Sequence, residues 1–269
     1  MIKLKFISNK DFVLQHILKS HSDYLPFVKL KRKVWNINEN LYWVLSQNLE
    51  PIIFNNGIIK GVPMAIPNLE SNLSSIYKTA EFKKIFREAE QYSNTIEKQW
   101  NANYDSSLIH LSNITKIDLS KINKEITVYV SHPKLWHGRA YVENNAITWS
   151  HPDEWKNYAT IYLWHEIMHH ITYNISTTPQ LMHAIIELSC DNELRIRMNK
   201  SKKYFEKNGT LMGHKYLINL KKKLLPDWKK YLKNPSENIY QFEKRMQKKY
   251  SKEKLLKPQS KIVEWADWH

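Results

Sequence analysis

Two histidines and a glutamate stand at a metal-binding spacing in the stretch TIYLWHEIMHHITY, residues 160–173. On a helix, His165 and His169 are four residues apart, so both imidazoles project from one face and can bind the same ion. Glu166 lies beside that face, within reach of a water molecule on the ion. The flanking residues are apolar on nearly every side, which predicts that the three polar side chains are buried and need partners. The pattern therefore predicts a metal-binding helix.

A second helix with two carboxylates is expected in the run QLMHAIIELSCDNELRIRM, residues 180–198. It places Glu187 and Asp191 four residues apart, and so on one face. These residues are candidates for a further ligand and for a group that holds a ligand in place. His183, fourteen residues after His169, is the rival for the position of third ligand. Both possibilities remain open, with Glu187 favoured.

The two patterns together, H-E-x-x-H and then E-x-x-x-D on the next helix, resemble the gluzincin branch of the zincin metallopeptidases over roughly residues 150–198. The resemblance implies one Zn²⁺ per chain, bound by His165, His169 and Glu187. Asp191 would accept the spare ring N–H of a ligand histidine and fix its tautomer. Glu166 would be the general base in the hydrolysis of a peptide bond by a metal-activated water. The chain is then a zinc metallopeptidase (metalloendopeptidase) whose substrates are peptides or proteins.

Two points of this resemblance stay open. SprT-like DNA-associated proteases close their metal site with a third histidine at a broadly similar interval, which is the arrangement that His183 would give. The group that stabilises the developing oxyanion is not assigned either. Its candidates are Tyr173, Tyr204, His214 and Tyr216.

The elements that must position these residues predict an α+β, mainly helical protein. EITVYV, residues 125–130, is typical of a strand, and GRAYVENNAITWS, residues 138–150, predicts a hairpin that turns at Asn144-Asn145. Ser150 is expected to cap a helix over 155–174, with Pro152 in its first turn. The result is a zincin-like core in which a small sheet precedes the active-site helix. The hairpin strand RAYVE, residues 139–143, is a candidate edge for binding substrate by strand addition.

Three consecutive regions follow from this pattern. Residues 1–120 form a mainly helical N-terminal region, residues 121–199 the zincin-like catalytic core, and residues 200–269 a basic helical C-terminal region. Breaks in the last region are expected at Asn208-Gly209, Pro226, Pro235 and Pro258.

The basic region predicts a polyanionic partner such as nucleic acid. The net charge is +15, and residues 200–261 contain 19 Lys/Arg against 5 Asp/Glu, which is nearly the whole excess. Such a block attracts phosphates, and its aromatic residues could stack on bases. The candidate contacts are Lys221, Lys222, Lys223, Lys229 and Lys230. An alternative function is therefore a nucleic-acid-binding protein on a zincin-like scaffold.

Composition narrows the remaining classes. The single cysteine, Cys190, is expected to be a small buried residue, and five glycines leave no Gly-rich phosphate loop. No stretch is apolar enough for a membrane span, and the N-terminal residues lack the apolar core of a signal peptide. These features predict a cytoplasmic protein.

Overall fold

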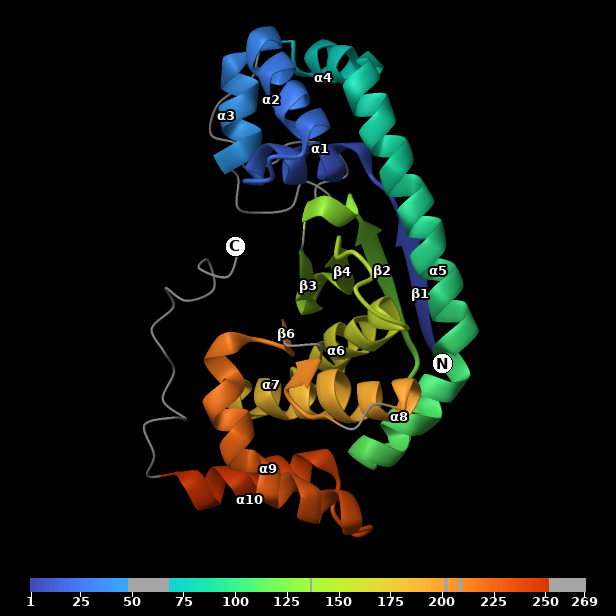
Figure 1. Cartoon of the computed structure of the whole chain (residues 1–269), viewed down its shortest axis with the longest axis vertical. Coiled ribbons are helices and arrows are strands. Elements are labelled where there is room, and N and C mark those ends of the chain that lie inside the picture. Colours follow the sequence, from blue (N-terminus) through green and yellow to red (C-terminus); the bar gives the residue numbers. More distant parts are fainter. Residues whose placement is uncertain (48–67, 136, 201–202, 208–209, 252–269) are drawn as a thin grey trace. The chain divides into compact units, whose positions relative to one another are not determined.

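The structure is a computed structural model that describes residues 1–47, 68–135, 137–200, 203–207 and 210–251. It is mainly helical with a four-stranded sheet, which confirms the predicted α+β class (Figure 1). The chain packs into two units. Unit 1 comprises residues 1–3, 98–125 and 153–269, and unit 2 comprises residues 4–97 and 126–152.

These boundaries differ from the three consecutive regions that the sequence predicts. The sheet expected to accompany the catalytic helices belongs to unit 2, together with the N-terminal helices. The reason is strand β1 (Ile2–Ile7), which lies beside β2 in the sheet order β1-β2-β4-β3. The segment IKLKFI alternates apolar and charged residues, which is the pattern of a half-buried strand.

The other strands of unit 2 form as predicted. Strand β2 (Lys124–Val130) pairs in parallel with β4 (Ala146–Trp149), and β3 (Gly138–Tyr141) pairs with β4 in antiparallel orientation. The hairpin turns through η4 (Val142–Asn144) and Asn145, whose φ of 46° is left-handed. Asparagine tolerates that conformation better than most residues, which is why the turn falls where the sequence predicts it. Strand β3 is an edge strand of the sheet.

Helices complete unit 2 around an apolar core. They are α1 (Lys10–Lys19), α2 (Leu25–Ile37), α3 (Glu39–Gln47), α4 (Leu69–Lys78), the single turn η3 (Pro133–Leu135) and the first half of α5 (Ala80–Thr115). Their inward faces meet in a buried cluster that includes Leu14, Phe27, Leu30, Val34, Ile76, Phe82 and Ile85. Burial of these side chains is the main favourable term in the folding of this unit.

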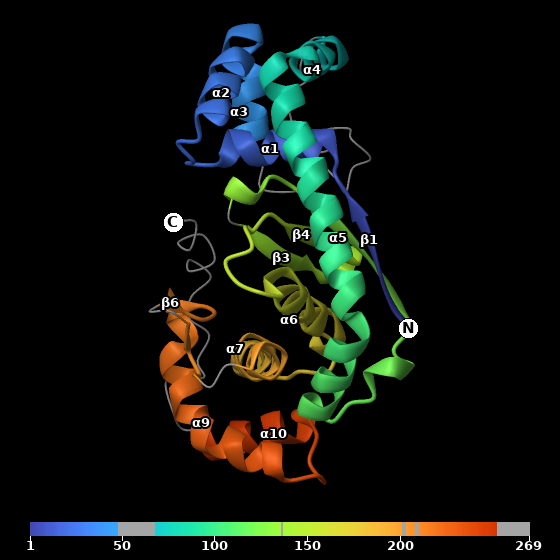
Figure 2. The same cartoon turned by 45° about the vertical axis from the view of Figure 1, so that its right-hand side comes forward.

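Unit 1 carries the two predicted metal-site helices. Its elements are the second half of α5, η2 (Leu119–Lys121), α6 (Tyr158–Thr172), α7 (Pro179–Glu187), the π-helix η5 (Leu188–Leu194), α8 (Arg195–Asn199), β5 (Glu206–Lys207), β6 (Thr210–Leu211), η6 (Lys215–Leu217), α9 (Ile218–Lys233) and α10 (Ile239–Tyr250). Helix α6 packs against α7 and η5, and α7 packs against α9 and α10 (Figure 2). Helices α9 and α10 therefore support α7 directly.

Two expectations about helix ends are wrong. Helix α6 begins at Tyr158, and Ser150 does not cap it: the Ser150 hydroxyl donates to the carbonyl oxygen of His137 at 2.9 Å and accepts from the His137 N–H at 3.0 Å. Pro226 does not break α9 but lies inside it. Its side chain is on the exposed side of the helix, where water can bind the backbone carbonyl that loses its N–H partner.

The remaining three predicted breaks in the basic region have different outcomes. Pro235 falls between α9 and α10, as predicted. The breaks expected at Asn208-Gly209 and at Pro258 lie outside the described residues. Among the residues that the structure describes, no helix is both long and apolar enough to cross a membrane.

Candidate metal centre

Helix α6 is held in place on nearly every side. Most of its residues are buried, and the Trp164 indole N–H donates to the Ser107 hydroxyl of α5 at 2.7 Å. The open N–H groups of its first turn are bound by side chains: Gln99 accepts from the Thr160 N–H at 3.1 Å, and Asp153 accepts from the Ala159 N–H at 3.3 Å. The helix therefore presents its polar face to α7 from a fixed position.

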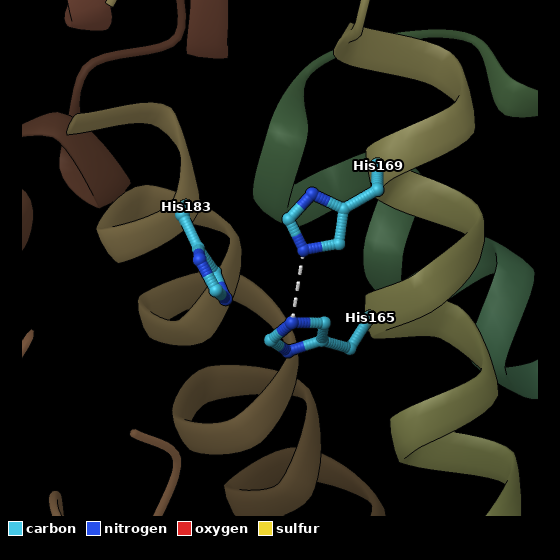
Figure 3. A group of neighbouring side chains, drawn as sticks. All are labelled: His165, His169 and His183. Carbon is cyan, nitrogen blue, oxygen red and sulfur yellow. Dashed lines mark hydrogen bonds between the residues drawn. The ribbon is translucent and has the colours of Figure 1, made fainter. Parts of the chain in front are cut away.

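Three imidazoles meet between α6 and α7. Figure 3 shows His165 and His169 on α6 and His183 on α7, with their rings turned toward one another. One nitrogen from each ring lies within 4.8 Å of the other two. The Nε2 atoms of His165 and His169 are 3.2 Å apart. Two imidazole ligands of a tetrahedral Zn²⁺ have their nitrogens about 3.3 Å apart, so this pair fits a zinc ion.

The third imidazole lacks a hydrogen bond that it should have. The Nε2 atom of His183 is buried and has no hydrogen-bond partner among the described residues. Its other nitrogen, Nδ1, is 3.2 Å from the Tyr216 hydroxyl. A buried polar atom without a partner is unfavourable, and a cation between the three rings would supply that partner. The donor set is therefore suited to a metal ion that prefers nitrogen ligands.

Asp191 fixes the orientation of one of these rings. Its Oδ1 atom is 2.9 Å from Nδ1 of His165, and both side chains are buried. This is the hydrogen bond that the sequence predicts between Asp191 and a ligand histidine. It makes Nδ1 of His165 the N–H donor and turns Nε2 toward His169 and His183.

The charges around the cluster determine which of its two α6 histidines is protonated when no metal is bound. Burial lowers the pKa of His165, but Asp191 and then Glu166 and Glu187 outweigh that effect and raise the pKa to about 9. Burial and the neighbouring His165 lower the pKa of His169 well below its usual range. His165 is therefore the ring that carries the positive charge, and His169 stays neutral. Glu166 itself is nine-tenths buried, next to His165 on α6.

Glu187 is bound by a different set of partners. Its carboxylate is fully buried: Oε1 accepts from the N–H of His214 at 2.9 Å and lies 2.6 Å from His214 Nδ1, and Oε2 pairs with the Lys221 ammonium. Burial raises the pKa of Glu187, but the His214 hydrogen bond and the Lys221 charge outweigh this and lower it. Lys221 also donates to the Met212 carbonyl at 2.8 Å. The carboxylate is thus ionised and held on both oxygens.

This arrangement bears on the choice of third ligand. Across the described parts of the chain, His183 belongs to the group formed by His165 and His169, and Glu187 does not. The geometry therefore favours His183, the arrangement that the sequence placed second. Glu187 as a ligand remains a prediction, and it would require the carboxylate to leave His214 or Lys221.

Two features around Glu187 escaped the sequence reasoning. The segment after α7 is a π-helix, in which the Asn192 amide donates to the Glu187 carbonyl at 2.8 Å and Arg195 Nε donates to the Asp191 carbonyl at 2.8 Å. Arg195 thus binds the backbone of Asp191. The second feature is Gly213, which has a φ of 73°. A Cβ atom there would lie 2.2 Å from Glu187 Oε2, so only glycine fits where this turn crosses the carboxylate.

Two of the four candidate oxyanion groups lie next to the histidine cluster, and the other two do not. His214 and Tyr216 lie beside His183, with ring centroids 4.6 Å and 6.2 Å from it. Tyr204 instead pairs with Glu193 through its hydroxyl, and Tyr173 is about half exposed at the end of α6. Of the four possible oxyanion groups, His214 and Tyr216 are the two next to the cluster.

Two neighbouring residues were also assigned an environment from the sequence. His170 follows His169 directly, and its direction about a third of a turn away predicts a place on the outer face of the helix; it is buried instead, because α6 is covered on that side as well. Cys190 is buried, as expected.

The basic region needs one correction among its five candidate lysines. Lys221 is fully buried and paired with Glu187, so it is not available to a polyanion. Lys222, Lys229 and Lys230 are exposed on α9. Lys223 is partly buried, with its ammonium 5.0 Å from the ring centroid of Tyr250.

The aromatic residues of this region are mostly part of a core. Trp228 and Tyr231 are fully buried and stack with ring centroids 4.9 Å apart, and Tyr231 lies 4.8 Å from the ring centroid of Phe242 on α10. Tyr250 is buried as well. The expectation that Trp228, Tyr231 and Tyr250 stack on bases is therefore wrong, because these rings occupy the apolar face that joins α9 to α10.

Comparisons with protein-family models, with curated proteins and with solved structures find no match for this chain. Its function must therefore be inferred from the chemistry of the site itself.

The buried Lys221–Glu187 pair gives a prediction about stability. Replacing Lys221 with Met should lower the free energy of unfolding by about 3–5 kcal/mol, because it leaves a buried carboxylate without its counter-charge. Lys222→Met, one residue away on the exposed face, should change it by less than about 0.5 kcal/mol. Urea unfolding followed by circular dichroism measures both. Equal effects of the two substitutions would contradict the burial of Lys221.

Proposed function

We propose that this protein is a zinc-dependent peptidase whose metal ligands are His165, His169 and His183. The observation that carries the proposal is the convergence of the three imidazoles, one of which is fixed by Asp191. Asp191 pairs with His165, but among the described residues the buried Nε2 atom of His183 has no hydrogen-bond partner, so hydrogen bonds alone leave the cluster incomplete. A divalent cation would supply the missing partner.

The chain's own groups divide the chemistry between them. A bound zinc ion would supply a Lewis acid that lowers the pKa of a water molecule toward neutrality. Glu166, adjacent to His165, accepts a proton from the attacking water and passes it to the leaving amine. Asp191 holds His165 in the tautomer whose Nε2 faces the metal. Among the described residues this group offers three ligands, so a tetrahedral zinc ion bound there would keep a fourth position for water.

Peptide as the substrate class is supported by the resemblance of H-E-x-x-H to the zincin motif. The hairpin strand RAYVE lies in unit 2 and the histidine cluster in unit 1, so its role in substrate binding stays a prediction.

A second function, binding of nucleic acid or another polyanion, is supported by the exposed lysines of α9. Lys222, Lys229 and Lys230 project from the helix into solvent. Lysine delivers a point charge to a phosphate, whereas the reading of bases needs a planar fork or an amide. Binding by this surface would therefore depend on the backbone of the polyanion and show little sequence preference.

Zinc content tests the ligand set. Protein purified without chelators should contain about one zinc per chain, and His183→Ala should lose it while Glu187→Gln retains it. The reverse order would support the gluzincin arrangement with Glu187 as ligand and reject His183. Zinc is measured by mass spectrometry on protein whose fold is verified by circular dichroism.

Glu166→Gln tests catalysis separately from metal binding. The variant should keep its zinc and its fold, but peptide hydrolysis should fall by about 10²–10⁴-fold because the general base is lost. Turnover is followed with a quenched fluorescent casein substrate in the presence and absence of a chelator. Wild-type turnover in the zinc-loaded variant would remove Glu166 from the reaction.

Salt dependence tests the lysine surface. Affinity for a fluorescent single-stranded oligonucleotide should fall with ionic strength, with a log–log slope of roughly −0.7 per phosphate contacted. Replacing Lys222, Lys229 and Lys230 with Gln should lower both the affinity and the slope. The matched control replaces three exposed lysines of α5, Lys83, Lys84 and Lys98, which removes the same charge elsewhere. If both triple variants lose affinity equally, the effect is one of net charge and α9 is not the binding surface.

A further inference from the structure

A second group of possible ligands adjoins the first and shares one residue with it. The ligand atoms of His183, Glu187 and His214 also lie within 4.8 Å of one another. In this group Glu187 Oε1 is 2.6 Å from His214 Nδ1 and 3.7 Å from His183 Nε2. Two imidazoles and a carboxylate are a donor set typical of zinc, and the hydrogen bond between Glu187 and His214 must open to admit the ion.

His183 cannot serve both groups at once. Its Nδ1 atom is next to the Tyr216 hydroxyl, which leaves Nε2 as the atom that both groups would use. A cation bound with His165 and His169 therefore leaves Glu187 and His214 without their third partner, and the reverse also holds. The two groups are alternative positions for one ion.

The nearby charges make these two positions unequal. The Lys221 ammonium already neutralises Glu187, so the second group offers a dication little net attraction. The first group has the Asp191 carboxylate on His165 and the Glu166 carboxylate next to it. A cation should consequently be bound more tightly by the first group.

The second group contains a ligand that is open to solvent. The side chain of His214 is 39% exposed, that of His183 19% and that of His165 3%. Each group as a whole has one buried and two partly exposed residues. An ion that arrives along His214 therefore meets the second group first.

We propose that His183, Glu187 and His214 form an entry site, from which a divalent cation passes to His165 and His169 as His183 moves with it. This inference rests on the proposed function for the destination of the ion, but the entry site itself does not depend on catalysis. His214 is then a residue of metal loading. It sets how fast the ion arrives and has little influence on how tightly the final site holds it.

Cobalt binding to the apoprotein tests the entry site at equilibrium. Co²⁺ replaces zinc in such sites and reports its coordination through its visible absorption. Wild-type protein should bind one equivalent. The His165→Ala/His169→Ala variant should still bind one equivalent, at least about tenfold more weakly, because the second group remains but lacks the nearby carboxylates. Adding His214→Ala to that variant should abolish binding. A second version with His165→Asn and His169→Gln guards against misfolding, and melting curves compare all variants.

Stopped-flow uptake of Co²⁺ tests the order of events. His214→Ala should slow loading of the otherwise intact protein by about tenfold, by loss of one of three ligands, while the final content stays at one equivalent. His21→Ala, which removes an exposed histidine of unit 2, is the matched control and should load at the wild-type rate.

The outcomes separate the two proposals. If the wild type binds one Co²⁺ and both folded double variants bind none, the entry site is refuted and the three-histidine centre stands. If His214→Ala abolishes binding while the double variants retain it, the ion resides in the second group, and the proposed function is refuted. Unchanged uptake in His214→Ala refutes the loading role.

Discussion

The buried carboxylate of Glu187 is the constraint on which the arrangement of unit 1 depends. An ionised group without solvent is stable only if it is paired and hydrogen-bonded, and α7 alone cannot provide those partners. They come from much later in the chain: the turn that contains Gly213 and His214, and Lys221 on α9. Satisfying one carboxylate therefore brings α9 against α7 and requires a glycine where the turn crosses over it.

The same pairing explains why the histidines remain available. With both oxygens of Glu187 occupied, the Nε2 atom of His183 has no hydrogen-bond partner in the described part of the chain. His165 has Asp191 on one nitrogen, and its other nitrogen faces His169. Burial opposes a second positive charge on these rings, as the lowered pKa values of His169 and His183 indicate. A metal cation would bind the imidazoles in their neutral forms, so no further ring would have to be protonated. This is the physical reason to propose a metal centre here.

The sequence predicts local features of this protein better than distant ones. The spacing of His165 and His169 and the helix that carries them follow from helical periodicity, and the strand predicted at 125–130 follows from its strand-forming residues. The hydrogen bond to Asp191 is what the resemblance to the gluzincins implies. The partners of Glu187 do not, because nothing local to Lys221 marks it as buried. The two residues after it are also lysines, and only the packing of α9 on α7 distinguishes it from them. For the same reason the ligand choice between Glu187 and His183 could not be made from spacing: both lie one turn apart on α7.

The number of lysines and arginines in the basic region also overestimates the positive charge that its surface presents to a partner. On α9, Lys221 points inward to a carboxylate, while Lys222, one residue and about 100° further around the helix, is exposed. Several other cations of this region are paired: Lys249 contacts Asp227 at 2.7 Å, and Arg245 contacts Glu237 at 2.7 Å. Among the described residues, the candidate lysines that remain exposed to a polyanion are Lys222, Lys229 and Lys230 on α9, fewer than the sequence suggests. Because the salt slope scales with the number of phosphates contacted, so small a set of lysines should bind weakly and with a shallow dependence on salt.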